Sequence, residues 1–447
     1  MRPALYALSM LFAVRALADS TLVGNLIQEQ INSGLTRGVA VTLIANGDER
    51  KAVYGDATSD QSLFEIGSIS KSFTGIVTAQ LSLEKKLDLK SPISTYISEL
   101  KGTFVGSVNA NQLGTHTAQL TNNMVDVNGK ITKDFSEAEL IAFLKFYNPD
   151  LSHYPKGKRQ YSNLGFATLG LVISRIEKKS FASVVQEKIL NVLKMKETGF
   201  IHSINRPTGL LQGYSVVLEP LSYEPSSDLQ LASGGIYSNL IDMTNYLRAN
   251  LHPESSSLKL AINLSHQLGL GWDSQPSQPI IWKNGAMPAG FSSFLKFDRT
   301  TKKGLIVMAN DLNIEATMHI SDAALDIQPP LYSYVDTAVP VQTMPMALGS
   351  YVSDGGSLEI EVFSVGSQYL GIYFKKGFPK NGPESFYKWR LMQQSTGVFL
   401  VNNGVTISDA VFFNWNSVTQ KMEIVYASFQ GFDSEGKPIY VKKTFQR

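Results

Sequence analysis

The chain has 447 residues, of which 43% are hydrophobic and 17% are charged, and its formal net charge at pH 7 is +2. A chain of this length exceeds one ordinary core, so two or three domains are expected, and the composition is that of a globular protein. Lysine and arginine are spread along the chain without a basic stripe, which excludes nucleic acid as a partner.

The first predicted element is a secretory signal peptide at residues 1–18. Arg2 gives it a basic start, an apolar run follows over residues 4–14, and Ala16-Leu17-Ala18 is typical of a cleavage site. The apolar run is shorter than the about 20 residues that a membrane-spanning helix needs, so no stable membrane span is expected after cleavage. The sequence therefore predicts export, to the periplasm or as a secreted protein.

The chain contains no cysteine and six histidines. An exported protein without cysteine has no disulfides, so its stability must come from a large core. Thiolate metal sites are excluded, and no pair of histidines has the H-E-x-x-H spacing that would place two imidazoles on one helical face. We therefore expect no metal and no other cofactor.

Next along the chain, residues 39–53 have the pattern of a β-hairpin. An apolar strand over residues 39–44 is followed by an Asn46-Gly47 turn and a return strand through Val53. The stretch FEIGSISKSF at residues 64–73 then ends a strand-like run and opens a helix with one apolar face, which predicts that Ser68 lies at the start of a buried helix.

Ser68 and Lys71 are three residues apart, so in a helix they lie on the same face. A hydroxyl beside an amine is the arrangement of an activated nucleophile. The same S-x-x-K spacing recurs at Ser82, Ser98, Ser256 and Ser385, so the tetrapeptide needs support from elsewhere in the chain.

Two further short motifs supply that support. Tyr161-Ser162-Asn163 lies between a polar loop and a helix in a mainly helical stretch, about residues 95–265, and Lys283-Asn284-Gly285 ends a predicted strand. The small residues after Lys283 leave room for a substrate backbone. Three similar tripeptides are less suited: residues 237–239 are predicted to be part of a turn, 302–304 lie in a polar turn, and 375–377 lie in the C-terminal region.

Three strand-like segments follow the helical stretch, at residues 279–282, 292–298 and 303–309. Together with the early hairpin they predict one sheet built from both ends of an α+β domain, at residues 19–327. Prolines 329, 330, 340 and 345 then predict a linker at 328–346. Residues 347–447 consist of short strands separated by turns, which predicts a small antiparallel β-barrel or sandwich.

The ordered set S-I-S-K, Y-S-N and K-N-G resembles the motifs of the penicillin-recognising serine hydrolases, meaning class C β-lactamases and DD-peptidases. The segments LGTHTAQL at 113–120, LASGGIYSNLIDM at 231–243 and WKNGAMPAGFSS at 282–293 also look like parts of that family, so the resemblance covers about residues 36–310. It implies an antiparallel sheet flanked by helices, and the appended C-terminal β domain is similar to those of some such peptidases.

The resemblance implies that Ser68, Lys71 and Tyr161 are catalytic. Ser68 would attack a carbonyl carbon and form an acyl-enzyme, and Lys71 would accept or relay its proton. Tyr161 would act as a base while nearby cations favour its phenolate, and then as an acid toward the leaving group. His116, in LGTHTAQL, is expected to be structural.

The resemblance also implies a substrate-binding set: Asn163, Lys283, Asn284, Gly285 and Ala286. Asn163 would contact Lys71 and a substrate amide, Lys283 would orient Tyr161 and attract a substrate carboxylate, and the backbone amides of Ser68 and Ala286 would form an oxyanion hole. Two positions depart from the family: Asn284 stands where it usually has Thr or Ser, and residues 118–119 are Ala-Gln instead of Ser-Gly.

Three functions agree with these residues. The first is hydrolysis of D-Ala-D-Ala-like peptides, such as a peptidoglycan stem peptide, or of β-lactams. The second is an S-x-x-K esterase or D-aminopeptidase on the same scaffold, since the fold does not choose the substrate. The third is a peptidoglycan-binding or sensor protein without turnover. The partner in each case is a small molecule or a peptide.

Overall fold

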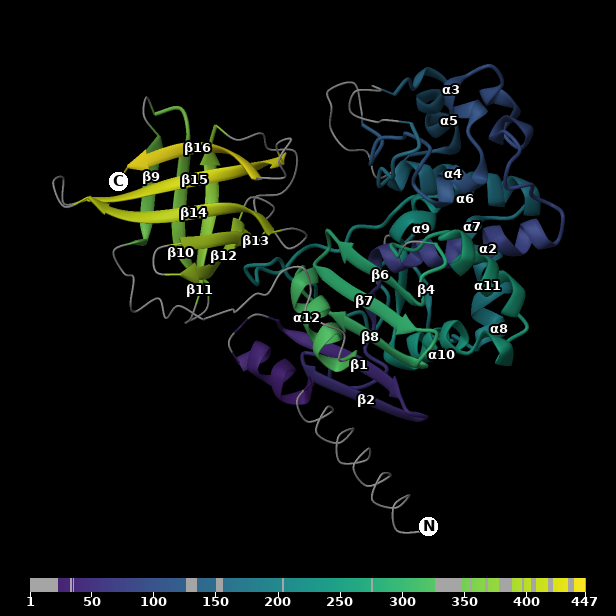
Figure 1. The fold of residues 1–447 in the computed structure, drawn as a ribbon, viewed down its shortest axis with the longest axis horizontal. Coiled ribbons are helices and arrows are strands. Elements are labelled where there is room, and N and C mark those ends of the chain that lie inside the picture. Colours follow the sequence, from purple (N-terminus) through teal and green to yellow (C-terminus); the bar gives the residue numbers. More distant parts are fainter. Residues whose placement is uncertain are drawn as a thin grey trace, which may run out of the picture.

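The structure is a computed structural model. It describes residues 23–125 except 33 and 35, residues 135–149, residues 156–325 except 203, 204 and 275, and most of the C-terminal region: 347–353, 356–365, 369–377, 388–395, 398–402, 407–416, 421–432 and 438–446. The predicted signal peptide (1–18) and linker (328–346) lie outside the described residues. Figure 1 shows a larger part, formed by helices and a sheet, and an all-β part beside it.

The central sheet of the larger part has five antiparallel strands in the order β2-β1-β8-β7-β6. Their bounds are β1 Gly38–Ala45, β2 Asp48–Gly55, β6 Ile280–Met287, β7 Phe291–Asp298 and β8 Lys303–Ala309. Asn46 and Gly47 both have positive φ, as a tight hairpin turn between β1 and β2 requires. The predicted sheet, which joins the two ends of the domain, is confirmed by the pairing of β1 with β8.

The two faces of this sheet are covered by different helices, because side chains alternate along each strand. Val39 and Val41 pack with the helical residues 23–32 and with α12, Ile314–Leu325. Ala40 and Ile306 face the other way, into the main core, toward the helices that carry the site. Figure 1 shows α12 lying over β7 and β8.

Most helices gather on the second face and beyond it (Figure 1). The α-helices are α2 Ser70–Leu83, α3 Phe104–Ser107, α4 Ala110–Gly114, α5 Glu137–Phe146, α6 Asn163–Glu177, α7 Phe181–Val185, α8 Asn191–Leu193, α9 Asp228–Gly234, α10 Leu240–Leu251 and α11 Lys259–Leu268. Single turns are η1 Gly67–Ile69, η2 Ile93–Thr95, η3 Ser98–Leu100, η4 Gln186–Leu190 and η5 Pro253–Ser255. Helix α2 is buried along nearly its whole length and contacts α6, α9 and α11. No helix within the described ranges is both long and apolar enough to cross a membrane.

A second, three-stranded sheet has the order β3-β5-β4, with β3 Phe64–Glu65, β5 Ile236–Ser238 and β4 Gly199–Phe200. Tyr237 lies in β5, so its predicted place in a turn was wrong. A strand of three residues is too short to show an alternating pattern, while the two preceding glycines favour a turn.

The C-terminal part is a closed antiparallel barrel, which is the first of the two predicted alternatives, a barrel or a sandwich. Its strands are β9 Gly349–Ser353, β10 Glu359–Val365, β11 Tyr369–Lys376, β12 Lys388–Ser395, β13 Val398–Asn402, β14 Ile407–Asn416, β15 Lys421–Phe432 and β16 Pro438–Gln446. Strand β9 pairs with both β10 and β16, which closes the ring. Ile360, Ile372 and Ile424 are fully buried in its core.

The barrel touches the larger part through a few specific contacts. Lys388 Nζ donates to Glu219 Oε1 at 2.7 Å, and Arg390 Nη2 donates to the Gly34 carbonyl oxygen at 3.2 Å. Val365 of β10 packs against Val216 and Val217 in a small apolar cluster.

Candidate active site

Ser68 lies in the turn η1, which runs directly into α2, so it stands where the sequence predicted the start of a buried helix. Gly67 has φ +51°, which bends the chain out of β3 and into the turn. Because η1 continues directly into α2, residues 68 and 71 still lie on one side, and Lys71 Nζ donates to Ser68 Oγ at 3.1 Å. Ser68 itself is half-buried.

The Ser68 hydroxyl also lies 2.5 Å from the hydroxyl of Tyr161, so it contacts both predicted proton carriers. Lys71 is fully buried and has two further acceptors: Asn163 Oδ1 at 2.7 Å and the Ser233 carbonyl oxygen at 2.5 Å. An ammonium group has three N–H donors, so these contacts account for all of them. Lys71 is therefore held in one place beside the serine.

The pKa values of Lys71 and Tyr161 are both shifted downward. Burial lowers the pKa of Lys71, and the charge of Lys283 adds to the effect, although Tyr161 opposes it. Burial alone would raise the pKa of Tyr161, but the charges of Lys71 and Lys283 outweigh it and lower that pKa. Both groups can therefore give up a proton more readily than in water, as a base for the serine requires.

Tyr161 is positioned by the loop that leads into α6. Ser162 caps this helix, since its Oγ accepts from the Gly165 amide at 2.8 Å, and the Ser162 amide donates to Nδ1 of His116 at 3.0 Å. The buried ring of His116 also lies 4.6 Å from the ring of Tyr161. Burial holds the pKa of His116 well below its ordinary value, so the neutral imidazole supports the loop.

Asn163, the first residue of α6, connects Lys71 to the 121–125 segment. Its Oδ1 accepts from Lys71, and its Nδ2 donates to Asn123 Oδ1 at 2.9 Å. The side chain is half-buried. It therefore lies between the lysine and a neighbouring polar loop.

Lys283 lies in the middle of β6 and not at a strand end, because the strand continues through Met287. Its Nζ forms a 2.5 Å ion pair with Asp273 Oδ2, and it lies 5.4 Å from the centre of the Tyr161 ring. The other oxygen of Asp273 accepts from Arg159 at 2.6 Å. Burial alone would raise the pKa of Asp273, but Lys283 and Arg159 lower it, so the carboxylate is charged.

The sequence did not identify Asp273 and Arg159 as part of this site. Each belongs to no motif, and their only signals are that Asp273 follows LGLGW directly and that Arg159 stands two residues before Tyr161. They are 114 positions apart in the chain, and only the fold brings them together.

Strand β6 lies directly against the serine turn. A Cβ atom added to Gly67 would lie 2.7 Å from the amide nitrogen of Ala286, so the predicted oxyanion-hole segments are neighbours. A Cβ atom on Gly285 would lie 2.1 Å from the carbonyl oxygen of Ile66. The missing side chain at Gly285 therefore makes room for the serine turn.

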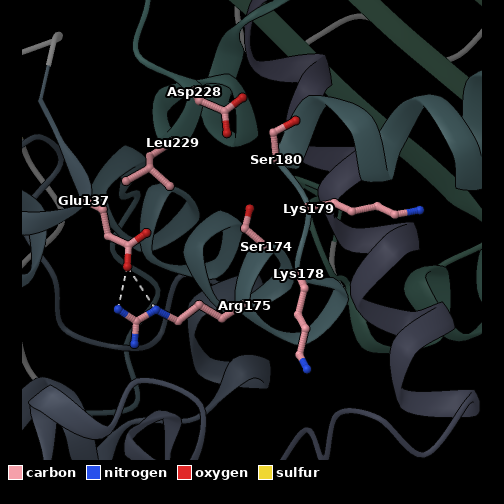
Figure 2. A pocket seen from close by; sticks show the side chains of 8 residues that line it. All are labelled: Glu137, Ser174, Arg175, Lys178, Lys179, Ser180, Asp228 and Leu229. Carbon is pink, nitrogen blue, oxygen red and sulfur yellow. Dashed lines mark hydrogen bonds and ion pairs between the residues drawn. The ribbon is translucent and has the colours of Figure 1, made fainter.

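A surface pocket of about 540 Å³ lies elsewhere, beside α6 and α7, and contains none of the predicted site residues. Figure 2 shows Arg175 reaching Glu137 across it. Arg175 also pairs with Glu99, and Lys179 pairs with Glu187, so most of the cations here are already neutralised. The chemistry of Ser68, Lys71 and Tyr161 makes their surroundings the stronger candidate for the active site.

The chain is similar to known β-lactamases. A β-lactamase of Pseudomonas fluorescens is 28% identical over 286 residues, which cover 59% of this chain and 75% of that protein. A β-lactamase of Providencia stuartii is 29% identical over 285 residues, which cover 61% of this chain and 69% of that protein.

Among solved structures, a β-lactamase/D-alanine carboxypeptidase from Pseudomonas syringae superimposes with a TM-score of 0.61 and 22% identity, over 70% of this chain and all of that one. This likeness shows that the fold is that of the β-lactamases and DD-peptidases. The family model described as Beta-lactamase matches residues 23–326. The chain therefore belongs to the β-lactamase family and is a serine hydrolase.

Proposed function

We propose that the protein hydrolyses D-Ala-D-Ala-like peptides or β-lactams through a covalent acyl-enzyme on Ser68. The observation that carries this proposal is that Ser68 Oγ lies within hydrogen-bonding distance of both Lys71 Nζ and Tyr161 Oη, at 3.1 and 2.5 Å. Peptidoglycan stem peptides lie outside the cytoplasm, so the peptide substrate also requires the predicted export of the chain.

In the first step, Ser68 Oγ attacks the carbonyl carbon of the scissile amide, and its proton passes to Tyr161 or Lys71. The carbon–nitrogen bond then breaks, and the same group returns the proton to the leaving nitrogen. In the second step, water attacks the ester of the acyl-enzyme and loses a proton to that group. The bond between the carbonyl carbon and Ser68 Oγ then breaks, and the group returns the proton to Ser68 Oγ, which frees the acid. The backbone amides of Ser68 and Ala286 would stabilise the oxyanion in both steps.

Asn163 and the K-N-G strand would hold the substrate. Asn163 lies between Lys71 and the neighbouring loop, where its amide can contact a substrate amide. Strand β6, with Lys283, Asn284 and Ala286, would lie beside the bound substrate because Gly285 brings it against the serine turn.

A second candidate is an esterase or D-aminopeptidase that uses the same serine. Asn284 favours it, because an amide replaces the hydroxyl with which the family usually helps to hold a substrate carboxylate. A protein that binds peptidoglycan without turnover is the third alternative, and it differs from the others in leaving the acyl-enzyme intact.

The test is intact-mass spectrometry of the protein with a fluorescent penicillin, followed over time. Ser68→Ala removes the nucleophile, and Ser82→Ala is the matched control, since Ser82 has the same S-x-x-K spacing elsewhere. A transient adduct that requires Ser68 supports a β-lactamase, and a persistent one supports a penicillin-binding peptidase or sensor. Absence of any adduct would remove the β-lactam proposal in favour of esters, and an adduct that survives Ser68→Ala would show that the nucleophile is another residue.

A further inference from the structure

Two of the three N–H donors of the Lys283 ammonium group already have acceptors within the chain. It donates to Asp273 Oδ2 at 2.5 Å and to Asn284 Oδ1 at 3.4 Å. The Lys283 side chain is fully buried and that of Asp273 is 9% exposed. The cation that a substrate carboxylate would need is thus paired with an internal carboxylate.

Releasing Lys283 from this pair would be costly. A buried carboxylate that loses its cation is left partly desolvated and uncompensated, so a substrate carboxylate would have to share the lysine with Asp273 or displace it. Arg159 holds the other oxygen of Asp273 at 2.6 Å, which resists displacement. The Arg159 side chain is 43% exposed, so water screens its own attraction for an anion.

Asn284 acts in the same direction. Its carbonyl oxygen accepts from Lys283, so it takes a second N–H donor that a substrate carboxylate would otherwise use. Both side chains of the K-N-G motif therefore contact each other or Asp273. Lys283, Arg159 and Asp273 together carry one net positive charge instead of two.

From this geometry we infer that Asp273 determines the charge selectivity of the site: it takes the place of a substrate carboxylate on Lys283 and directs hydrolysis toward acyl compounds whose leaving group carries no carboxylate. The inference rests on the proposed acyl-enzyme chemistry at Ser68. Among the candidate functions it favours the esterase, because the leaving side of a D-Ala-D-Ala peptide or a β-lactam carries a carboxylate.

The test uses two esters with the same acyl group, the phenyl ester and the 3-carboxyphenyl ester of phenylacetylglycine, and measures phenol release. We expect the wild type to hydrolyse the two with kcat/KM values within about threefold of each other. Asp273→Asn frees Lys283, so it should raise the preference for the carboxyphenyl ester about tenfold, the order of one hydrogen bond to a charged group. The gain should come from a lower KM for that ester, so the readout is the ratio of the two kcat/KM values and not the rate for either ester alone.

Two variants separate this effect from a general one. Asp273→Glu keeps the charge and should keep selectivity near that of the wild type. Asp322→Asn is the matched control, because Asp322 forms a similar ion pair with Lys296 at 2.6 Å. Lys296 pairs across the strands with Trp282, the neighbour of Lys283, and so lies on the opposite face of the sheet.

The outcomes separate a failure of the proposed function from a failure of the inference about Asp273. If neither ester is hydrolysed in a Ser68-dependent way, the proposed function fails, and the inference fails with it. If both are hydrolysed but Asp273→Asn leaves their ratio unchanged, the inference alone is wrong. A wild type that prefers the carboxyphenyl ester tenfold or more would also overturn it, even if the variant does not fold.

Discussion

Lys71 and Tyr161 form a coupled pair, since each changes the proton affinity of the other. Lys71 Nζ lies 4.8 Å from the centre of the Tyr161 ring, and both residues contact Ser68 Oγ. Burial makes it costly to keep the ammonium groups of Lys71 and Lys283 charged near one another. This favours a neutral Lys71 or a tyrosinate at Tyr161. Lys71 Nζ and Tyr161 Oη therefore both lie within hydrogen-bonding distance of Ser68 Oγ, and either can accept its proton.

The lowered pKa values predict the pH dependence of acylation. The base is active when deprotonated, so kcat/KM should rise with pH through the pKa of the pair, below the ordinary tyrosine value of 10.0. Tyr161→Phe should remove this rise and lower acylation by about 10²- to 10⁴-fold. The measurement is the pH profile of kcat/KM for an ester. Tyr237→Phe, in the other Y-S-N tripeptide, is the control, and an unchanged profile in Tyr161→Phe would contradict the assignment.

Among the site residues, the sequence could predict those that stand at a recognisable spacing within a short motif. Ser68 and Lys71 are one turn apart, and Tyr161 and Lys283 stand in recognisable tripeptides. Asp273 has no such neighbours, and its partners come from a distant loop and a strand. A lone aspartate carries no signal of the cation that it will meet, so the internal ion pair could not be predicted.

At the scale of elements, the contact between β6 and η1 determines the geometry around the serine. Gly285 and Gly67 allow the two backbones to touch, and Ser293 Oγ on β7 donates to the same Ile66 carbonyl oxygen at 2.9 Å. The strand and the turn therefore form one unit.

Gly285→Ala should disrupt this unit, because the added methyl group overlaps the Ile66 carbonyl oxygen. We expect the free energy of unfolding to fall by about 1–3 kcal/mol, as for other overpacked sites. Acylation should fall by about tenfold or more as the serine turn moves. Chemical denaturation and ester hydrolysis measure the two effects.

Gly165→Ala is the matched control for this substitution. It lies in α6 near Tyr161, but its new Cβ would meet its nearest neighbour at 3.4 Å, an ordinary contact. Normal stability and activity in Gly285→Ala would show that β6 and η1 are not tightly packed.

The elements themselves were predicted where an apolar pattern was long enough. Strands β7 and β8 carry clear apolar runs, and β1 and β2 flank an Asn-Gly turn, so all four could be recognised. Strand β6 was predicted to end near Trp282, because Lys283, Asn284 and Gly285 interrupt the apolar pattern. The polar residues of the K-N-G motif interrupt the apolar pattern because they are predicted to bind substrate, while the strand itself continues to Met287.

At the scale of the molecule, a buried carboxylate lies near the contact between the barrel and the larger part. Asp311, two residues beyond β8, accepts hydrogen bonds from Thr36 Oγ1 and, at 3.0 Å, from the Arg37 amide. Burial raises the pKa of Asp311 to about 6, although these hydrogen bonds and the charge of Arg390 from the barrel oppose the rise. Arg390 is itself fully buried.

Asp311 should make the protein less stable as the pH rises. Its pKa is about 6 in the folded chain against an ordinary 3.8, so its contribution is present below 3.8 and is lost as the pH rises through 6. Asp311→Asn keeps the shape and removes the titration. The free energy of unfolding of the variant relative to the wild type should therefore increase by about 2 kcal/mol between pH 4 and pH 7.

Chemical denaturation at several pH values tests this, with Asp322→Asn as a control for the loss of one carboxylate. Parallel stability curves for the wild type and Asp311→Asn would show that Asp311 is ionised in the folded protein throughout that range.

The pairing of β1 with β8 also has a consequence for synthesis. Val39 pairs with Ala309, so the free edge of the β1–β2 hairpin stays unpaired until β8 is synthesised, when nearly the whole domain has left the ribosome. Contacts so distant in sequence form slowly, because a long loop must close first. The serine turn also lacks its contact with β6 until late in synthesis, since β6 begins only at Ile280. A nascent chain that already contains SISK is therefore not yet a hydrolase, and its activity begins only when the last strands join the sheet.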